Sequence, residues 1–346
     1  MKHSVNYIFR APEAGFHSIE GVFSNVGGML REEYDVRNEY MPMRGASLQS
    51  MARNYAAARR IRGDINHVTG HVNYIVPALQ NYTVLTVHDV YSSFAGRFLR
   101  DKIIRFLWFR WPARRANKLT AVSEFSANEL CRIVPGAASK IHVVHDPYDP
   151  SFNYAESNFN AAQPRILHIG TKPNKNLHRT IAALEGLQCQ LVIVGHVTDQ
   201  DRFVLDRAGV SYEAHESLSR REIVEQYEKC DLVCFASLYE GFGMPVIEAN
   251  VVGRPVVAGN IAAIPEVAGD AACLVDPYDP ADIRSGIDRV IQDHEYRREL
   301  VSKGVRNAER FNPRKIARDY AEMYCSALIR EKRPGARLRR KIRAKD

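Results

Sequence analysis

The chain has 346 residues, of which 45% are hydrophobic and 25% are charged. This composition is typical of a globular protein with room for two domains, and it excludes a chain that is disordered throughout. No apolar run approaches the roughly 18 residues of a membrane-spanning helix, and no secretory signal is recognisable at the N-terminus. The net charge is +8, and it is concentrated in two short segments discussed below.

Apolar, β-rich runs alternate with helix-like stretches in the first part of the chain, which indicates a βαβα order. The expected elements are strands at 5–9, 65–70, 82–90, 118–123 and 140–146, and helices at 47–61, 97–115 and 126–134. Ser123 follows one of these strands and is placed to cap the next helix. The proline-containing segment 147–164 has no sustained apolar period, so we expect it to link two domains.

The alternation of strands and helices then resumes. The expected elements are strands at 165–170, 190–195, 210–213, 231–237, 255–259 and 272–276, and helices at 176–187, 200–208, 219–229, 244–252, 280–292 and 313–330. Asp279 is placed to cap the helix that begins at Pro280, where proline is favoured.

These patterns predict an α/β fold of two doubly wound, Rossmann-like domains that face each other across a cleft. The predicted parts are an N-terminal domain at 1–150, a linker at 151–163, a C-terminal domain at 164–312, a helix at 313–330 and a basic tail at 331–346. Doubly wound sheets bind ligands beyond the carboxyl ends of their strands, so the residues that follow strands are the candidates for function.

The segment DLVCFASLYEGFGMPVIEA carries the richest chemistry. A strand ends shortly before Glu240, Gly241 and Gly243 follow in the loop, and a helix opens near Met244. Glycines and a helix N-terminus let backbone amides approach an anion, so we expect a phosphate here. Glu240 and Glu248 would repel that phosphate unless they bind sugar hydroxyls, which predicts a nucleotide-sugar ligand. The alternative is that both are solvated surface acids.

Residues 231–276, with YEGFGMPVIEANVVGRPVVAG and then IPEVAGDAACLVDP, resemble the retaining GT-B glycosyltransferases of family 4. The hallmark of that family is the E-x7-E spacing. HIGTKPNKNL at 168–177, HVTGHVNY at 67–74, VLTVHDV at 84–90 and AVSEFSANEL at 121–130 extend the resemblance over nearly the whole chain. It implies a GT-B fold whose N-terminal domain faces the acceptor and whose C-terminal domain binds the donor.

The resemblance also implies roles for individual residues. Glu248 would bind the donor ribose, Glu240 would contact the transferred sugar near the reacting centre, and Lys175 would neutralise the leaving diphosphate. The implied donor-binding set is Gly170, Thr171, Lys172, Lys175, Gly241, Phe242, Gly243, Met244, Pro245, Val246 and Glu248. The alternative for Lys175 is that it only opens a surface helix.

Two parts of the chain depart from the family pattern. Relatives carry Gly-Arg where this chain has Gly170-Thr171, and Lys172 could substitute for that arginine without its bidentate fork. Relatives also carry a Gly-Gly pair in the first loop, where this chain reads RAPEAGFHS. Gly15 in that loop and His71 are therefore the acceptor-side candidates, and the acceptor contacts are open.

A third candidate for catalysis is His88, at the end of the strand YTVLTV. The family places a histidine here, where it could orient the acceptor hydroxyl or the sugar. A packed or helix-capping histidine is the alternative. No metal-binding motif is recognisable, so we expect donor activation without a metal ion and no cofactor besides the donor substrate. Retention of the anomeric configuration is implied by the resemblance alone.

The two basic segments are 97–118, with eight basic residues and one acidic, and 331–346, with eight basic and two acidic. The rest of the chain carries a net charge of −5, so the charge points to an anionic surface more than to general nucleic-acid binding. A helical wheel over 97–115 places Leu99, Ile103 and Phe106 toward the core. It places Ile104, Trp108 and Trp111 on a second stripe, beside Arg97 and Arg100, as at a lipid headgroup boundary. The alternative is that this second stripe packs against a neighbouring helix.

The combined prediction is a hexosyltransferase that uses a GDP- or UDP-sugar, with mannose or glucose as the sugar. Its acceptor would be a saccharide or a lipid-linked sugar, as in bacterial surface polysaccharide and lipopolysaccharide assembly. The six cysteines follow neither metal-ligand nor disulfide spacings, which favours the cytoplasm, at the inner face of its membrane. The alternatives are a sugar-nucleotide hydrolase or epimerase, a nucleic-acid-binding module and an inactive nucleotide-sugar sensor.

Overall fold

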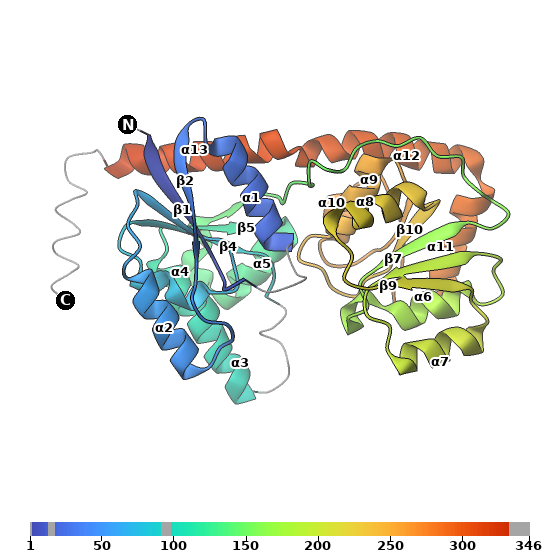
Figure 1. Cartoon of the computed structure of the whole chain (residues 1–346), viewed down its shortest axis with the longest axis horizontal. Coiled ribbons are helices and arrows are strands. Elements are labelled where there is room, and N and C mark those ends of the chain that lie inside the picture. The colour runs from blue at the N-terminus through green and yellow to red at the C-terminus, as the bar shows by residue number, and fades with distance from the viewer. Residues whose placement is uncertain (1, 13–17, 91–97, 332–346) are drawn as a thin grey trace. The chain divides into compact units, whose positions relative to one another are not determined.

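The computed structural model describes residues 2–12, 18–90 and 98–331, and the chain in it forms two compact units (Figure 1). The first unit comprises Met1–Val122, Ala127–Val144 and Pro313–Asp346, and the second comprises Ser123–Ser126 and His145–Asn312. The chain therefore passes between the units at four places, and the segment predicted as a linker, 151–163, lies wholly in the second unit. The predicted basic tail lies outside the described residues except for Glu331.

The first unit contains a six-stranded parallel sheet in the order β2-β1-β3-β4-β5-β6. Its strands are β1 (His3–Phe9), β2 (Tyr34–Tyr40), β3 (Ile65–Val68), β4 (Tyr82–Val87), β5 (Lys118–Ala121) and β6 (Ile141–Val143). The principal helices are α1 (Ser18–Leu30), α2 (Leu48–Ala58), α3 (Phe98–Ile104), α4 (Trp111–Arg115), α5 (Glu124–Ile133) and α13 (Pro313–Glu331). Every residue of β3 and β4 is buried, as expected for central strands of a parallel sheet.

The second unit contains another six-stranded parallel sheet, in the order β12-β11-β10-β7-β8-β9. Its strands are β7 (Arg165–Ile169), β8 (Gln190–Val194), β9 (Tyr212–His215), β10 (Leu232–Phe235), β11 (Val256–Gly259) and β12 (Cys273–Val275). Its helices include α6 (Leu177–Leu184), α7 (Asp199–Ala208), α8 (Arg220–Lys229), α9 (Met244–Val252), α10 (Ile264–Ala268), α11 (Pro280–Gln292) and α12 (His294–Ala308). The predicted class of two doubly wound α/β domains is thus confirmed.

Four elements were not expected from the sequence, and each has a physical reason. Strand β2, YDVRNEY, lies at the edge of its sheet and is mostly exposed, so it lacks the apolar pattern of an inner strand. Helix α1 contains Gly27-Gly28, which weakens the helical signal. Helix α12 is strongly polar, so it lacks a clear apolar stripe. Helix α10 has only 5 residues, which is too short for a periodic pattern.

Two predicted helix caps are confirmed. The side chain of Asp279 accepts a hydrogen bond from the amide of Ala281, and Pro280 is the first residue of α11. Ser123 precedes α5, and its hydroxyl accepts from the amide of Ser126 at 3.0 Å. Both side chains satisfy amides that the first helical turn leaves unpaired.

Helix α13 completes the core of the first unit, where it packs against α1 (Figure 1). Tyr320 and Tyr324 on this helix are buried, and the hydroxyl of Tyr324 lies 2.6 Å from Nδ1 of His67 on β3. Nε2 of His67 lies 2.7 Å from the hydroxyl of Thr86. Burial lowers the pKa of His67 to about 3, so the ring stays neutral at physiological pH.

Candidate donor-binding site

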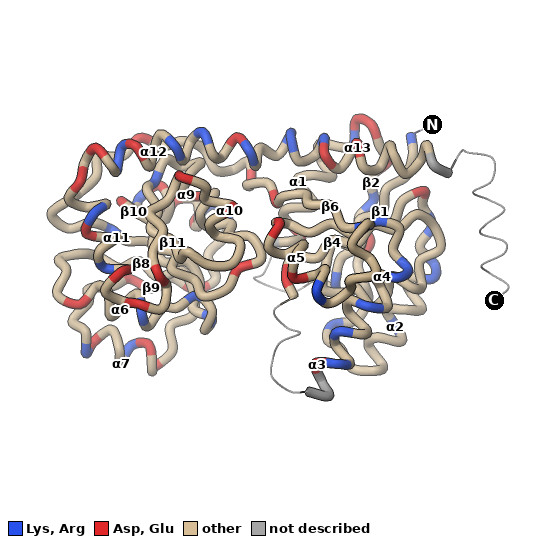
Figure 2. The backbone as a smooth tube through the Cα atoms, turned by 180° about the vertical axis from the view of Figure 1, so that it is seen from behind, with Lys and Arg blue, Asp and Glu red and all other residues tan. Residues whose placement is uncertain are grey.

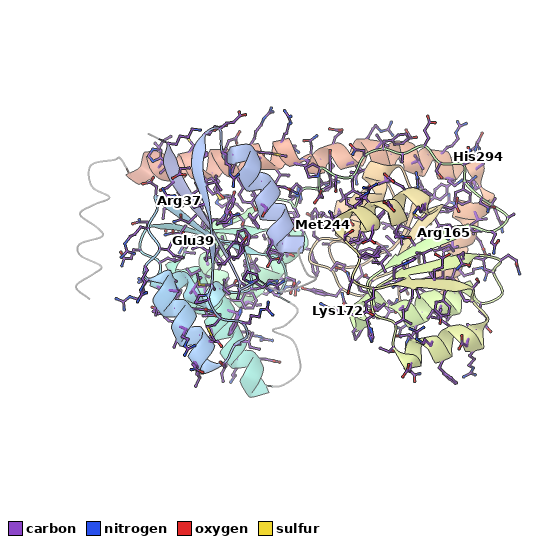
Figure 3. The ribbon with its side chains drawn as sticks, in the orientation of Figure 1. Arg37, Glu39, Arg165, Lys172, Met244 and His294 are labelled. Carbon is purple, nitrogen blue, oxygen red and sulfur yellow. The ribbon has the colours of Figure 1, made fainter. Side chains whose placement is uncertain are left out.

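The second sheet reverses its strand order between β7 and β10. Open α/β sheets bind ligands beyond the carboxyl ends of the strands at such a reversal. The loops that follow β7 and β10 contain the residues predicted for donor binding. In Figure 3, Lys172 and Met244 lie at this end of the second sheet, whereas Arg165 lies at the start of β7.

The loop after β7 is held in a fixed conformation by Gly170 and Asn176. Gly170 has φ +87°, and a Cβ atom there would lie 3.0 Å from Cγ of Lys175. Asn176 is left-handed, with φ 64°, and it is 4% exposed. Its side-chain Nδ2 donates to the carbonyl of Ala236 at 2.9 Å and to that of Pro277 at 2.6 Å. These bonds fix the short helix 173–175 that carries Lys175.

Lys175 forms an ion pair with Glu240, with 2.7 Å between Nζ and Oε1. Nδ2 of Asn174 donates to Oε1 of Glu240 at 3.4 Å and to the carbonyl of Tyr239 at 3.0 Å. The ammonium lies 4.9 Å from the ring centroid of Phe235. Both charged side chains are largely buried, so the pair is screened less by solvent than a surface pair would be.

The loop from Glu240 to Met244 presents backbone donors. Gly243 has φ +113° and caps α9, a conformation that favours glycine. The amides of residues 241–244 donate no hydrogen bond to any other residue in the described ranges. Pro245 has no N–H, and the amide of Val246 donates to the carbonyl of Gly243 at 3.0 Å. Unpaired amides at a helix N-terminus are suited to an anion such as a phosphate.

The carbonyl of Gly241 is held from its other side by two serines. The hydroxyl of Ser123 donates to it at 2.6 Å and the hydroxyl of Ser126 at 2.9 Å. Glu266 accepts from the amides of Glu124 and Phe125. These contacts lie within the second unit and restrict the glycine loop, and sequence reasoning identified none of these partners of the loop.

Glu248 on α9 is 6% exposed, and it lies close to two residues of α8. The hydroxyl of Tyr227 donates to its Oε2 at 2.7 Å. Nη2 of Arg220 lies 3.2 Å from its Oε1. Glu248 is therefore not the solvated surface acid of the alternative interpretation. Sequence reasoning missed both partners, because nothing in SRREIVEQYEK distinguishes them from other residues of a polar helix.

The remaining donor-side predictions are spread over the loop after β7. Thr171 packs on Gly195, where a Cβ atom would lie 2.9 Å from Cγ2 of Thr171. Lys172 is exposed at the start of the short helix 173–175. The structure therefore brings together Lys175, Glu240 and the loop at 241–244. Lys172 lies on the same loop after β7 as Lys175.

The acceptor-side candidates belong to the first unit. Nε2 of His88, which follows β4, donates to the carbonyl of Thr69 at 2.9 Å. His71 follows β3 with φ 60°, and burial lowers the pKa of its ring. A Cβ atom at Gly70 would lie 3.1 Å from Cδ2 of His88, so the loops after β3 and β4 are in contact. Gly15 lies outside the described residues.

The predicted orientation of the basic helix is wrong for Ile103 and Phe106, whereas the alternative that the second stripe packs against its neighbours is confirmed for Ile104 and Trp108. Ile104 and Trp108 pack against the core of the first unit, and Nε1 of Trp108 donates to the carbonyl of His71 at 2.9 Å. Ile103 and Phe106, predicted to face the core, are 51% and 46% exposed. Residues 105–110 form a π-helical segment between α3 and α4, so a wheel drawn with α-helical spacing misplaces the side chains. The side chains of residues 97–100 lie outside the described part.

The described residues contain neither a metal-binding cluster nor a membrane-spanning helix. No group of three or more His, Cys, Asp or Glu side chains in the described ranges is arranged to hold a metal ion. None of the helices in those ranges is long and apolar enough to cross a membrane.

Two family matches agree with this geometry. Residues 3–152 match the family Glycosyltransferase Family 4, and residues 152–306 match the family Glycosyl transferases group 1. Two doubly wound domains with the E-x7-E residues at the strand-order reversal of the second define a GT-B glycosyltransferase. The chain belongs to the group 1 glycosyltransferases of the family 4 type.

Curated relatives with similar sequences include two mannosyltransferases. The serotype-specific mannosyltransferase WbdA of Escherichia coli is 25% identical over 257 residues, which cover 66% of this chain and 32% of WbdA. The MMP alpha-(1->4)-mannosyltransferase of Mycolicibacterium hassiacum is 27% identical over 256 residues, covering 68% of this chain and 62% of the relative. The chain thus spans about a third of the length of WbdA.

Solved structures show the same fold at lower sequence identity. Anabaena HepE in complex with UDP and glucose has a TM-score of 0.73 and 18% identity, over 94% of this chain and all of that one. Sucrose-phosphate synthase from Thermosynechococcus elongatus has a TM-score of 0.79 and 16% identity, over 95% and 100%. WaaG, described as a glycosyltransferase involved in lipopolysaccharide biosynthesis, has a TM-score of 0.71 and 13% identity, over 92% and 99%.

Proposed function

We propose that this glycosyltransferase moves a hexose from a nucleotide diphosphate sugar to a saccharide or lipid-linked acceptor, with retention, in bacterial surface polysaccharide assembly. GDP or UDP is the proposed carrier. Mannose is the first sugar to test, because two relatives are named mannosyltransferases. The observation that carries the proposal is the Lys175–Glu240 ion pair beside the unpaired amides of residues 241–244.

The chemistry follows from where charge develops. As the bond between the sugar and the diphosphate breaks, the leaving phosphate oxygen gains negative charge. The Lys175 ammonium and the amides of residues 241–244 are preorganised to stabilise that charge. When the diphosphate takes over Lys175, the Glu240 carboxylate loses its partner and can accept hydrogen bonds from hydroxyls of the sugar.

Retention is proposed to occur by attack on the face from which the diphosphate leaves. The acceptor oxygen forms the new bond to the anomeric carbon, and its proton passes to the departing phosphate oxygen. This route needs no protein nucleophile. His88 is proposed to orient the acceptor hydroxyl, with His71 beside it, because both follow strands of the first sheet at the carboxyl end.

The test of the donor is a thermal-shift panel of UDP-, GDP-, ADP- and dTDP-sugars on the wild type and Glu248→Ala. Glu225→Ala, at a half-buried position of α8 where the side chain pairs with Arg221 and Lys229, is the matched control. A donor at about 100 times its dissociation constant adds roughly 2.7 kcal/mol of stability. One nucleotide class should stabilise the wild type and the control but not Glu248→Ala, and no shift with any donor would contradict the proposal.

Product analysis with and without acceptor separates the transferase from the hydrolase and epimerase alternatives. A transferase forms a new glycosidic bond only with acceptor present, and an α-linked product from an α-linked donor demonstrates retention. Free sugar released at the same rate without acceptor would identify a hydrolase. A changed sugar on the recovered nucleotide would identify an epimerase.

We also propose that the first unit contacts anionic lipid at the inner face of the cytoplasmic membrane. Ile103 and Phe106 are exposed apolar side chains, and Lys102, Arg110 and Arg114 are exposed on the same helical segment. Figure 2 shows the basic positions of α3 and α4 in blue along the backbone. Apolar and basic side chains together are suited to a headgroup boundary.

The test of this contact is sedimentation with vesicles of phosphatidylglycerol and phosphatidylcholine. Ile103→Ser with Phe106→Ser should weaken sedimentation with phosphatidylglycerol vesicles. The matched control is Phe203→Ser, which alters a 61% exposed aromatic side chain on α7 of the second unit. Equal binding by both variants would contradict this contact.

A further inference from the structure

The Glu248 carboxylate is the centre of a cluster built from three segments of the second unit. Glu248 comes from α9, and Tyr227 and Arg220 come from α8. Tyr227 donates to Oε2 at 2.7 Å, and Arg220 lies 3.2 Å from Oε1. A buried carboxylate is costly unless it is paired and hydrogen-bonded, and here each oxygen has one partner.

The third segment holds Arg220 in place. Nε of Arg220 lies 3.2 Å from Oδ2 of Asp149. The guanidinium lies over the ring of Phe152, 4.7 Å from its centroid. Phe152 is 2% exposed and packs against Tyr227 with 5.3 Å between ring centroids. The arginine is thus oriented by an ion pair and by a rigid aromatic ring at the same time.

The remaining acceptor capacity of Glu248 indicates what this cluster can bind. A carboxylate has about four lone-pair sites, two on each oxygen. Tyr227 occupies one site on Oε2 and Arg220 one site on Oε1. One site on each oxygen is left, which matches a ligand with two neighbouring hydroxyl donors.

We propose that Arg220 is a positioning residue that makes the donor site selective for nucleotides with a vicinal ribose diol. It fixes the direction of the Glu248 carboxylate by holding Oε1, so that the remaining acceptor site on each oxygen is set for the two ribose hydroxyls. Asp149 and Phe152 act through Arg220. This inference rests on the proposed function, in which Glu248 binds the donor ribose.

The experiment is calorimetric binding of UDP and GDP, each compared with its 2′-deoxy counterpart. The variants are Arg220→Gln, which removes the charge, and Arg220→Lys, which keeps the charge but loses the planar group. Asp149→Asn weakens the hold on Arg220 without altering Glu248. The matched control is Arg221→Gln, because the neighbouring Arg221 is 90% exposed and pairs with Glu225 on the same helix.

In Arg220→Gln, the affinity for the ribonucleotide should fall by about tenfold or more, the size of a lost charged hydrogen bond. The affinity for the 2′-deoxy nucleotide should change little, so the preference for ribose should fall by the same factor. Arg220→Lys and Asp149→Asn should give smaller changes in the same direction, and Arg221→Gln should match the wild type.

Two outcomes would overturn the inference, and they differ from failure of the proposed function. An unchanged ribose preference in Arg220→Gln would remove Arg220 from the ribose site. An equal loss of affinity for both nucleotides in Arg220→Gln, with a lowered melting temperature, would show that Arg220 has a purely structural role. Wild type that binds neither nucleotide would instead refute the proposed donor, and the inference with it.

Discussion

Lys175 and Glu240 form an ion pair of 2.7 Å although they lie 65 positions apart in the chain. They meet because β7 and β10 are neighbours in the second sheet and both loops leave from the same edge. Without a ligand each charge neutralises the other. In the proposed function, a diphosphate would compete with Glu240 for the ammonium, which would couple donor binding to the release of the Glu240 carboxylate.

Replacement of Lys175 by Met should lower kcat with saturating donor by roughly 10- to 150-fold. The variant loses a charged hydrogen bond worth about 1.5–3 kcal/mol, which is concentrated in the transition state where the leaving diphosphate is most charged. Steady-state kinetics with the donor that the thermal-shift panel selects measure the effect. Lys229→Met, which alters a 60% exposed lysine on α8, is the control. An unchanged kcat in Lys175→Met would show that the amides alone carry the leaving group.

Replacement of Asn176 by Ala should destabilise the second unit by about 2–4 kcal/mol. The variant loses the two buried side-chain hydrogen bonds of Asn176. Alanine must also adopt φ 64°, a strained conformation for a residue with a Cβ atom, without those hydrogen bonds to offset the strain. Asn176→Gly keeps the backbone conformation accessible and should lose less. Urea unfolding followed by fluorescence measures both variants. If Asn176→Gly and Asn176→Ala lower the free energy of unfolding equally, backbone strain makes no contribution to the loss.

Acidification should destabilise the first unit through His67. Its pKa is about 3 in the folded protein and about 6.5 in the unfolded chain, so the unfolded state binds protons first as the pH falls. The stability contributed by the neutral ring is complete above pH 6.5 and should fall by about 2 kcal/mol at pH 5.

Unfolding free energies at pH 7 and pH 5 measure this effect. His67→Gln should be less stable at pH 7 but should lose less stability between the two pH values. His196→Gln, at a 66% exposed side chain, should keep the wild-type dependence. Identical pH dependence in wild type and His67→Gln would exclude His67 as the sensor.

Glycosyl transfer should continue after removal of divalent cations. In the proposed site, Lys175 and the amides of residues 241–244 would supply the positive charge that a metal ion provides in other transferases. Initial rates before and after dialysis against EDTA test this expectation. A loss of activity that Mg²⁺ or Mn²⁺ restores would require a metal at the diphosphate.

The fold and the centre of the candidate site were predictable because their signals are local. The buried strand before Glu240, the glycines after it and the helix at Met244 give a strand-loop-helix pattern within one short segment. That pattern required only the order of elements and the known end of the sheet. The role of Lys175 at the diphosphate was implied by the family resemblance, and its ion pair with Glu240 was not predicted.

The rest depended on contacts that sequence patterns do not encode. Arg220 and Tyr227 are ordinary residues of a polar helix until α8 packs beside α9. The orientation of Ile103 and Trp108 depended on a π-helical segment, which has no clear sequence signature. The sequence predicted α13 as a separate C-terminal helix, and its place in the core of the first unit depends on packing.

The position of α13 has a consequence for synthesis on the ribosome. The first unit buries Tyr320 and Tyr324, which are translated after the whole of the second unit. The second unit can therefore complete its core while the first still lacks its last helix. During that interval His67 and the aromatic rings around it have no Tyr324 to bind, so the half of the protein that emerges first is the half that matures last.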